Sequence, residues 1–194
     1  MTKVAILGFG TVGSGVAEVL SKNSQGIARR SGGEIQVKYI LDVRDFPDSP
    51  FKDCFVKDFS IIENDPEVDV VVETIGGAKV ALEFTTRALK AGKSVVSSNK
   101  ELVATHGYEL LQLAKANGVS YLFEASVGGG IPILRPLTNC LAANEVEQIT
   151  GILNGTTNYI LTRMIKAGLT FEQALKEAQD NGYAEKDPTA DVDG

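Results

Sequence analysis

The sequence predicts an α/β fold, a doubly wound parallel sheet that is followed by the start of an α+β domain. Three observations lead to this prediction. Short apolar, β-branched runs alternate with helical patterns through residues 1–125, which is typical of parallel strands joined by helical crossovers. The glycine-rich run GFGTVG follows the first apolar run and opens the first helical pattern. From residue 126 onward the alternation gives way to consecutive helical patterns, which indicates a second domain.

The apolar runs of the first part are the predicted strands, and the segments between them are predicted helices or loops. The predicted strands are 3–7, 35–42, 69–74, 94–97 and 119–123. The predicted helices are 12–20, 80–91 and 107–117, and a glycine follows each of the last two. The polar segment 21–33 is expected to be a loop with some helix possible. The segment 45–58 contains two prolines and is expected to be a loop with at most a short strand.

The second part begins with a glycine-rich stretch and contains fewer predicted strands. The predicted elements are a possible helix at 132–141, a strand at 145–153, and helices at 156–167 and 170–179. Thr170 is followed three residues later by Gln173, the spacing of a capping box. The sequence ends in GYAEKDPTADVDG, a glycine- and acid-rich stretch that is unusual at a domain end. We therefore expect a domain boundary at 125/126 and a C-terminal truncation inside the second domain.

Composition excludes several classes of function. The chain has 194 residues and a net charge of −6, which argues against general nucleic-acid binding because that function usually needs a basic surface. Two cysteines and one histidine are too few for a disulfide framework or a four-ligand zinc site, and they favour a reducing, cytoplasmic setting. No apolar run reaches the roughly 18 residues of a membrane span, so we expect no membrane contact.

The run Gly8-Phe9-Gly10-Thr11-Val12-Gly13 predicts a dinucleotide-binding turn of the Rossmann type. In this motif Gly8 permits the tight turn, Gly10 lets a pyrophosphate approach the backbone, and Gly13 allows the helix to pack closely on the strand. The helix N-terminus then offers free N–H groups to the phosphates. The alternative interpretation is a glycine turn in an α/β fold that binds no nucleotide.

Charged residues at the end of the second predicted strand are candidates for reading the adenosine ribose. Asp42 or Asp45 could accept a hydrogen bond from the 2′-hydroxyl of NAD. Arg44 could instead pair with the 2′-phosphate of NADP, and we favour this second interpretation. The alternative for each residue is a solvated charge at a strand end.

Two further positions are candidates for a catalytic or an ion-binding role. Lys100 follows the strand 94–97, at the edge where open α/β sheets bind ligands, and a lysine there can neutralise a carboxylate or exchange a proton with an alkoxide. Glu124 precedes the glycine-rich run 126–131, whose carbonyl oxygens could turn toward a hard cation. From the residues alone, a surface lysine and an ordinary interdomain loop remain the simpler alternatives.

Taken together, the motifs resemble those of the homoserine dehydrogenases. Six stretches match in order along the chain: GFGTVGSGV at 8–16, VVVETIGG at 70–77, SSNKELVA at 97–104, EASVGGGIPI at 124–133, GILNGTTNYIL at 151–161 and GYAEKDPTADVDG at 182–194. The resemblance implies an oxidoreductase that transfers a hydride reversibly between aspartate 4-semialdehyde and L-homoserine with NADP or NAD, in threonine and methionine biosynthesis. It also implies an NAD(P)-binding Rossmann domain at 1–125 and a partial substrate-binding and dimerisation domain at 126–194. The full-length protein would be a homodimer or homotetramer.

The resemblance implies roles for individual residues. The expected dinucleotide contacts are Gly8, Phe9, Gly10, Thr11, Val12, Gly13, Arg44, Thr74, Lys100 and Gly182. Lys100 would also lie beside the substrate as a catalytic residue, and Glu185 would bind the substrate amino group. A sodium ion would be held by Glu124, Val127, Gly129 and Ile131. Family members carry a further aspartate and lysine at the reaction centre, which are expected beyond Gly194, and Asn154 is expected to have no catalytic role.

Three other functions stay open at this point. An aldehyde-oxidising semialdehyde dehydrogenase needs a nucleophilic cysteine, and neither Cys54, in a predicted loop, nor Cys140, in an apolar helical stretch, fits that role well. A sugar-type oxidoreductase could share the Rossmann domain and the active-site lysine. A non-catalytic nucleotide-binding module would bind the cofactor without turnover.

Overall fold

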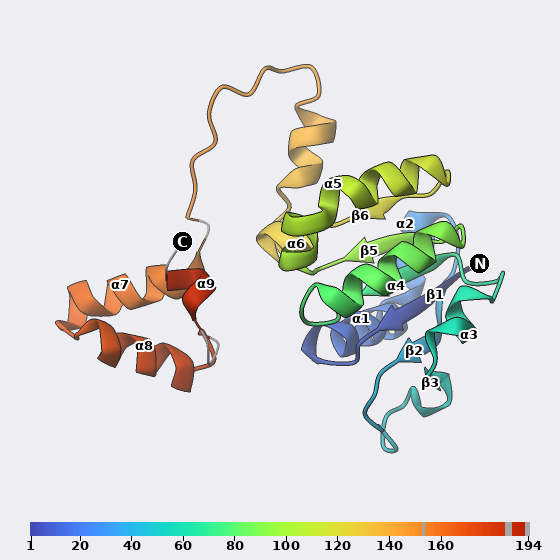
Figure 1. Cartoon of the computed structure of the whole chain (residues 1–194), viewed down its shortest axis with the longest axis horizontal. Coiled ribbons are helices and arrows are strands. Elements are labelled where there is room, and N and C mark those ends of the chain that lie inside the picture. Colours follow the sequence, from blue (N-terminus) through green and yellow to red (C-terminus); the bar gives the residue numbers. More distant parts are fainter. Residues whose placement is uncertain (153, 185–187, 193–194) are drawn as a thin grey trace. The chain divides into compact units, whose positions relative to one another are not determined.

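The computed structural model describes residues 1–152, 154–184 and 188–192, and its elements are labelled in Figure 1. By its internal contacts the chain divides into two compact units, Met1–Ala142 and Ala143–Gly194. The domain boundary at 125/126 stays a prediction. No helix within the described ranges is long and apolar enough to cross a membrane.

The first unit is built on a six-stranded sheet in which all strands are parallel, in the order β3-β2-β1-β4-β5-β6. The strands are β1 (Thr2–Leu7), β2 (Ile35–Leu41), β3 (Phe55–Val56), β4 (Val70–Glu73), β5 (Ser94–Ser97) and β6 (Tyr121–Leu122). This order confirms the predicted doubly wound α/β fold. The strand order reverses between β1 and β4, and sheets of this kind bind ligands beyond the carboxyl ends of the strands at such a reversal.

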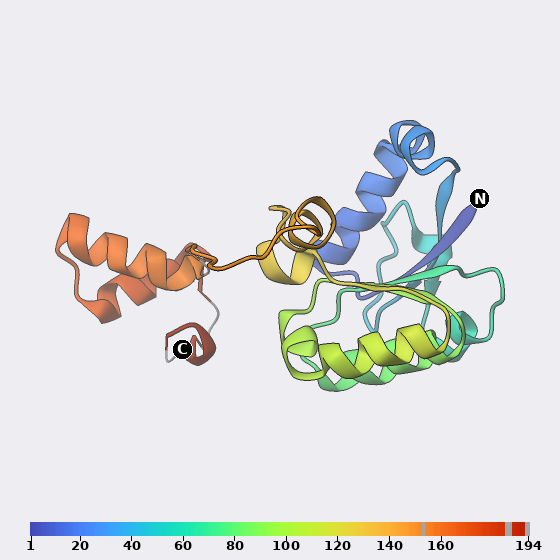
Figure 2. The ribbon, with the colours of Figure 1, turned by 90° about the horizontal axis from the view of Figure 1, so that it is seen from above.

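Helices cover both faces of the sheet (Figure 2). They are α1 (Thr11–Lys22), α2 (Ser24–Ser31), α3 (Phe59–Glu63), α4 (Lys79–Lys90), α5 (Lys100–Ala116) and α6 (Ala125–Gly128), with a 3₁₀ turn at Lys52–Cys54 and a π-helical turn at Pro136–Cys140. Figure 2 shows α1 and α2 on one face and α4 and α5 on the other.

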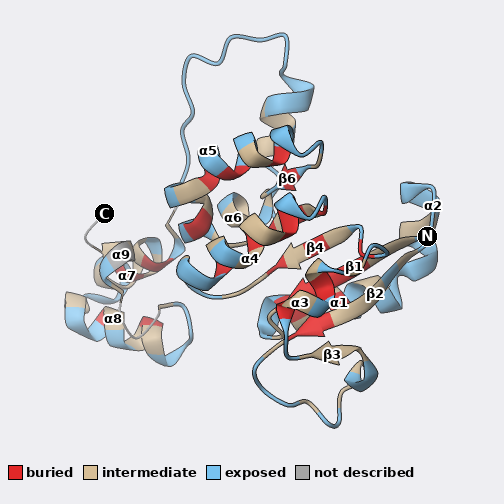
Figure 3. Cartoon of the chain, turned by 45° about the vertical axis from the view of Figure 1, so that its right-hand side comes forward, coloured by how far each residue is buried: buried red, intermediate tan, exposed pale blue. Residues whose placement is uncertain are grey.

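Alternate residues of β1 belong to two different cores. Val4 and Ile6 pack in the cluster that includes Ala17 of α1, whereas Ala5 and Leu7 pack in the larger cluster with residues of α3, α4 and α5. Buried positions accordingly line the strands and the inner helix faces in Figure 3. Burial on both faces explains why β1 is a continuous apolar run rather than an alternating one.

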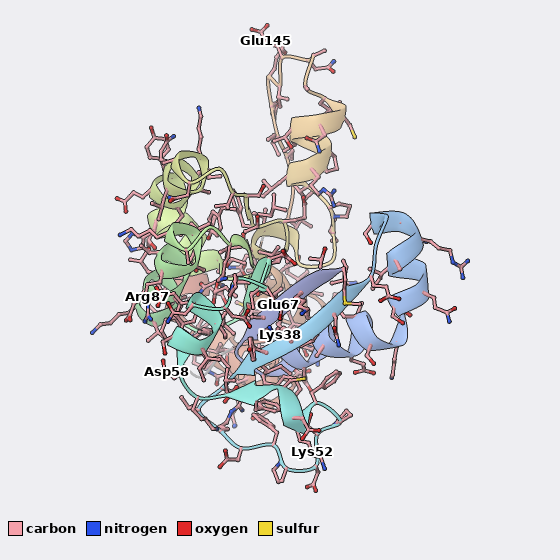
Figure 4. The ribbon with its side chains drawn as sticks, turned by 90° about the vertical axis from the view of Figure 1, so that its right-hand side faces the viewer. Lys38, Lys52, Asp58, Glu67, Arg87 and Glu145 are labelled. Atoms are coloured by element: carbon pink, nitrogen blue, oxygen red, sulfur yellow. The ribbon has the colours of Figure 1, made fainter. Side chains whose placement is uncertain are left out.

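A cluster of ion pairs ties the segment that precedes β4 to β1 and β2. The ammonium of Lys38 lies 2.6 Å from a carboxylate oxygen of Glu67 (Figure 4) and also pairs with Asp65. Lys3 pairs with Glu67 at 2.7 Å, and its backbone N–H donates to Asp69. These contacts fix the amino end of β4. They lie at the end of the sheet opposite to the carboxyl ends of the strands.

Three predictions for the first unit differ from the structure in extent. The predicted helix at 107–117 begins seven residues earlier, at Lys100, because the side chain of Asn99 caps it and Gly107 packs inside it against Val103. The polar segment 21–33 contains the helix α2, which ends at Gly32 in a left-handed conformation. The predicted helix at 132–141 is a short helical segment that ends in the π-helical turn.

The second unit is helical in its described part. It contains α7 (Gly155–Ala167), α8 (Phe171–Asp180) and α9 (Thr189–Val192), and α7 packs against α8 around Ile160 and Ala174. Thr170 and Gln173 form the predicted capping box at the start of α8.

The predicted strand at 145–153 is wrong for the described residues 145–152, which have no regular structure. Val146, Ile149 and Ile152 are all exposed. A β-strand needs a hydrogen-bonded neighbour, and no described strand pairs with this segment.

Candidate functional site

The turn between β1 and α1 has backbone geometry that depends on glycine. Gly8 adopts a φ of +89°, and its N–H donates to the carbonyl of Leu41 at 2.8 Å. A Cβ atom at Gly13 would lie 2.0 Å from the carbonyl oxygen of Gly8, whereas a Cβ at Gly10 would meet nothing within 4 Å. The first and third glycines therefore allow α1 to pack on the turn, and the second leaves an open approach to the backbone.

The N-terminus of α1 is prepared to bind an anion. Gly10 is its N-cap residue and makes no side-chain cap, and the first turn holds no acidic residue. Thr11 and Val12 are exposed. The N–H groups of a first helical turn have no partner within the helix, and the helix dipole adds positive potential there. A phosphate is the kind of ligand that this arrangement binds.

At the carboxyl end of β2, Asp42 acts as an acceptor for several donors. Its carboxylate accepts from the backbone N–H of Phe9 at 2.7 Å and from the backbone N–H of Arg44 at 2.9 Å. It also accepts from Nε and Nη2 of Arg44 at 3.1 and 3.0 Å. The Arg44 guanidinium and these N–H groups hold the pKa of Asp42 well below its usual range, against the opposing effect of burial.

Asp42 in turn orients Arg44, which projects toward solvent. The Arg44 side chain is 59% exposed, against 6% for Asp42, and its guanidinium carbon lies 5.1 Å from the centre of the Phe46 ring. The oriented guanidinium can receive a phosphate on its exposed side. Asp45 lies in the same loop and pairs with Lys57 at 2.8 Å.

Lys57 is a second cation at this place, and sequence reasoning missed it. Its ammonium donates to the backbone carbonyls of Asp42, Val43 and Arg44 at 3.1, 3.2 and 2.6 Å. It directly follows the two-residue strand β3, which pairs with the end of β2. The only available signal was a lysine beside a possible short strand.

A cavity of about 490 Å³ connects this region to the glycine turn. It is lined by residues from α4 and from the carboxyl ends of β1, β2, β3 and β4: Gly8, Gly10, Leu41, Asp42, Val43, Arg44, Lys57, Thr74, Ile75, Gly76, Val80 and Phe84. Its size and its mix of apolar walls and a few polar groups suit a small organic ligand.

On the other side of the turn, Thr74 joins β4 to β1. Its backbone N–H donates to the carbonyl of Leu7 at 3.0 Å, and its hydroxyl lies 2.8 Å from the same oxygen and 3.1 Å from the carbonyl oxygen of Gly8. Thr74 therefore fixes the position of the glycine turn from the neighbouring strand.

Lys100 is the exposed first residue of α5, at the carboxyl end of β5. The preceding residue, Asn99, caps the helix by accepting from the N–H of Leu102 at 3.0 Å. The Asn99 amide also donates to the carbonyls of Ile75 and Gly77 at 3.0 and 2.8 Å. These bonds connect the loop before Lys100 with the loop after Thr74, so the two candidates belong to adjacent strand ends.

In the loop that begins at Glu124, the candidate sodium site, the Glu124 carboxylate accepts hydrogen bonds from the backbone. Glu124 accepts from the backbone N–H groups of Ile133, Leu134 and Arg135 at 2.6, 2.9 and 2.8 Å, and these bonds hold its pKa below the usual range. The carboxylate thus caps the helical segment that follows. The backbone carbonyls of the loop are the remaining oxygen donors, and no cluster of three metal-ligating side chains occurs within the described ranges.

The described part of the second unit holds one of its two candidates. Gly182 follows α8 with a φ of +74°, while Glu185 lies outside the described residues. The hydroxyl of Thr156 lies 2.9 Å from the carbonyl oxygen of Tyr183 and 3.0 Å from the carboxylate of Asp191. The N-terminus of α7 therefore joins the segments on either side of Glu185.

The fold and the glycine turn define a dinucleotide-binding α/β domain of the Rossmann type. The family model for the NAD-binding domain of homoserine dehydrogenase matches residues 8–124, and the model for homoserine dehydrogenase matches residues 132–194. The chain belongs to the homoserine dehydrogenase family, which confirms the resemblance seen in the sequence motifs.

Individual relatives agree with this assignment. Homoserine dehydrogenase of Bacillus subtilis is 45% identical over 99% of this chain, and that of Pseudomonas aeruginosa is 46% identical over 99%. A homoserine dehydrogenase structure from Thiobacillus denitrificans covers 98% of the chain with a TM-score of 0.91 and 43% identity. A hyperthermophilic archaeal homoserine dehydrogenase in complex with NADPH covers all of it with a TM-score of 0.85 and 30% identity.

The relatives are longer than this chain. The chain spans 45% of the Bacillus subtilis protein, 44% of the Pseudomonas aeruginosa protein and 45% of the Thiobacillus denitrificans chain. It spans 65% of the archaeal chain.

Proposed function

We propose that this chain is the N-terminal part of an enzyme that interconverts aspartate 4-semialdehyde and L-homoserine with a nicotinamide cofactor. One observation carries the proposal: a cofactor turn and a lysine lie at the same edge of the sheet, in a chain 45% identical to a curated homoserine dehydrogenase over 99% of its length. The reaction serves threonine and methionine biosynthesis in the cytoplasm. The chain spans less than half of its curated relatives. The family resemblance implies that the whole protein carries a further aspartate and lysine at its reaction centre and assembles as a homodimer or homotetramer.

The cofactor in this proposal is NADP in preference to NAD. The residues fit a phosphorylated dinucleotide, because the glycine turn is open at Gly10 and two cations, Arg44 and Lys57, stand at the far end of the cavity. A guanidinium can pair with a phosphate through two hydrogen bonds. The archaeal relative that was solved with NADPH gives independent support.

When bound in its reduced form, the cofactor would supply the hydride for the aldehyde carbon and would be left as the oxidised nicotinamide. Reduction leaves negative charge on the substrate oxygen, and Lys100 stabilises that charge or donates a proton to it. Glu185 binds the substrate ammonium group and fixes the orientation of the substrate. The family resemblance implies that Thr74, Gly182 and the residues of the glycine turn contact the cofactor.

A sodium ion in the loop that begins at Glu124 belongs to the same proposal. Hard cations bind oxygen donors, and Val127, Gly129 and Ile131 offer backbone carbonyls within this loop. Glu124 would contribute through its backbone carbonyl, because three N–H groups already hold its carboxylate. The donor set therefore fits an alkali cation.

The test is steady-state kinetics of the complete protein and of its Lys100→Met variant, with homoserine and NADP. Methionine keeps most of the side-chain length, so we expect kcat to fall by roughly 10²–10⁴ while cofactor affinity changes little. Lys115→Met is the matched control, because Lys115 is an exposed lysine in the last turn of the same helix, and its kcat should equal that of the parent protein.

Three outcomes would contradict the proposal in different ways. A Lys100→Met variant whose kcat lies within about threefold of the parent value would exclude the role of Lys100. A complete protein that binds NADPH but turns over no substrate would be a nucleotide-binding module. Turnover of sugars without turnover of homoserine would point to a sugar-type oxidoreductase.

A further inference from the structure

Glu73 is a buried carboxylate for which the proposed reaction has no use. It is the last residue of β4 and is completely buried. No lysine, arginine or histidine pairs with it in the part of the chain that the structure describes. A buried carboxylate without a cation needs hydrogen-bond donors, because burial strongly disfavours the charged form.

Two donors meet at this carboxylate, one in the loop after β4 and one at the end of β5. Oε1 accepts from the backbone N–H of Ile75 at 2.7 Å, and Oε2 accepts from the hydroxyl of Ser97 at 2.5 Å. Burial raises the pKa of Glu73, and both donors oppose that rise. Each carboxylate oxygen therefore has its own partner, one after β4 and the other at the end of β5.

The hydrogen bonds continue from Ser97 into a closed ring. The Ser97 oxygen accepts from the backbone N–H of Asn99 at 3.1 Å, and the Asn99 amide returns to the carbonyl of Ile75 at 3.0 Å. Ile75 is thus held at its N–H by Glu73 and at its carbonyl by Asn99. In the sequence, Thr74 lies between Glu73 and Ile75, which are both members of the ring, and Lys100 directly follows Asn99, another member.

We propose that Glu73 is a positioning residue, which rests on the reaction proposed above. Its carboxylate holds the loops after β4 and β5 together and so fixes Thr74 and Lys100 relative to each other. The glycine turn and the adenosine end use contacts that do not involve Glu73. Thr74 bonds to Leu7 and Gly8 through its own N–H and hydroxyl, Gly13 packs on the turn, and Asp42 binds Arg44. Loss of Glu73 should therefore disturb the catalytic end of the site and leave cofactor affinity nearly unchanged.

The experiment compares Glu73→Met, Glu73→Gln and Thr85→Val in the complete protein. Methionine removes both acceptor oxygens, and glutamine keeps one. Thr85 is an equally buried polar residue of α4 whose hydroxyl has no hydrogen-bond partner in the described structure, so Thr85→Val controls for a buried polar-to-apolar change. We measure kcat per NADPH-binding site, the dissociation constant for NADPH, and amide hydrogen exchange at 74–78 and 98–103.

A positioning role predicts that kcat falls while the dissociation constant for NADPH stays nearly unchanged. A misplacement of about 1 Å can cost roughly 10²-fold in rate, so Glu73→Met should lower kcat by about 10–100-fold with the NADPH dissociation constant within about threefold of the parent value. Glu73→Gln should recover part of the rate, and Thr85→Val should resemble the parent protein. Exchange should accelerate at 74–78 and 98–103 in Glu73→Met and stay unchanged in the turn at 8–13.

The outcomes separate this proposal from the proposed function. If the parent protein is active and the kcat of Glu73→Met per binding site is within about threefold of it, the positioning role is overturned and the enzyme assignment stands. If the parent protein shows no turnover, the exchange data decide, and unchanged exchange at 98–103 overturns the role. If Glu73→Met does not fold, Ser97→Ala breaks the same ring at its hydroxyl, and it must show the same fall in kcat at nearly unchanged NADPH affinity for the proposal to survive.

Discussion

Replacing Gly13 with alanine is the sharpest steric test of the cofactor turn. The added Cβ would lie 2.0 Å from the Gly8 carbonyl oxygen and 2.8 Å from Oγ1 of Thr74, where ordinary contacts begin near 3.4 Å. The start of α1 must therefore retreat by about 1 Å or more from a backbone atom that cannot rotate away. Overpacking costs typically about 1–3 kcal/mol, and we expect the upper value, which corresponds to a Tm lower by about 6–12 °C.

Two other glycines of the same region provide matched controls. A Cβ at Gly15 meets nothing within 4 Å and lies inside α1, so Gly15→Ala should stabilise the protein by roughly 0.5–1 kcal/mol through helix propensity. A Cβ at Gly10 also meets nothing, so Gly10→Ala should leave Tm nearly unchanged. It should nevertheless weaken NADPH binding by about tenfold or more, because the methyl group stands where the pyrophosphate approaches the backbone.

The assay combines thermal unfolding, followed by circular dichroism, with fluorescence titration of NADPH. Gly13→Ala should lose both stability and affinity, Gly10→Ala only affinity, and Gly15→Ala neither. A Gly13→Ala protein with the Tm and affinity of the parent protein would refute the packing argument. Unchanged NADPH affinity in Gly10→Ala would refute the pyrophosphate contact.

The remaining predictions concern charge and capping. Arg44→Ala should weaken NADP binding by about tenfold or more with little effect on NAD binding, since a charge-assisted hydrogen bond is worth about 1.5–3 kcal/mol. Lys57→Ala should likewise weaken NADP binding more than NAD binding. Equal losses of affinity for both cofactors in a titration would exclude these roles. Folding lowers the pKa of Asp42 from its ordinary value of about 3.8, so the stabilisation from this carboxylate is present above that pH and is lost as the pH falls through the folded value. Asp42→Asn should therefore reduce Tm at pH 7 and flatten the fall of Tm below pH ~4, and parallel curves for parent and variant between pH 2 and 6 would contradict this sign. Thr170→Ala removes the capping box of α8 and should cost about 0.5–2 kcal/mol locally, seen as faster amide exchange in α8; unchanged exchange there would show that the cap contributes nothing.

Strands were the most predictable part of the fold, because the inner strands β1, β4 and β5 contain no exposed residue and each includes a short apolar run that local sequence reveals. β1 and β5 match their predicted ranges almost residue for residue. The predicted strand at 145–153 also contains β-branched residues, including Val146, Ile149 and Ile152, but it lacks a described partner, and pairing is a long-range property that no local pattern contains. The start of α5 differs from the predicted start at Gly107, because the side chain of Asn99 caps the helix and Gly107 lies within it.

The candidate site was predictable where a short motif determines the local backbone structure. The glycine turn is such a case, because larger side chains would collide at Gly8 and Gly13 and an open backbone is needed at Gly10. Lys57 and Glu73 were missed because their meaning depends on contacts between distant segments, namely Lys57 with the loop after β2 and Glu73 with Ser97 on β5. The predicted strand at 69–74 includes Glu73 and indicates a buried segment, but no local pattern shows that its carboxylate binds Ser97.

The central place of β1 in the sheet has a consequence for how the chain is made. β1 is hydrogen-bonded to β2 on one edge and to β4 on the other, and Val4 pairs with Val70. A ribosome that adds about 5–20 residues per second completes β4 roughly 3–13 s after β1. During that interval an apolar strand with one open edge is present on the nascent chain, and such edges attract other chains. The strand that leads into the cofactor turn is thus synthesised before either of its neighbours and gains the second of them only when β4 is complete.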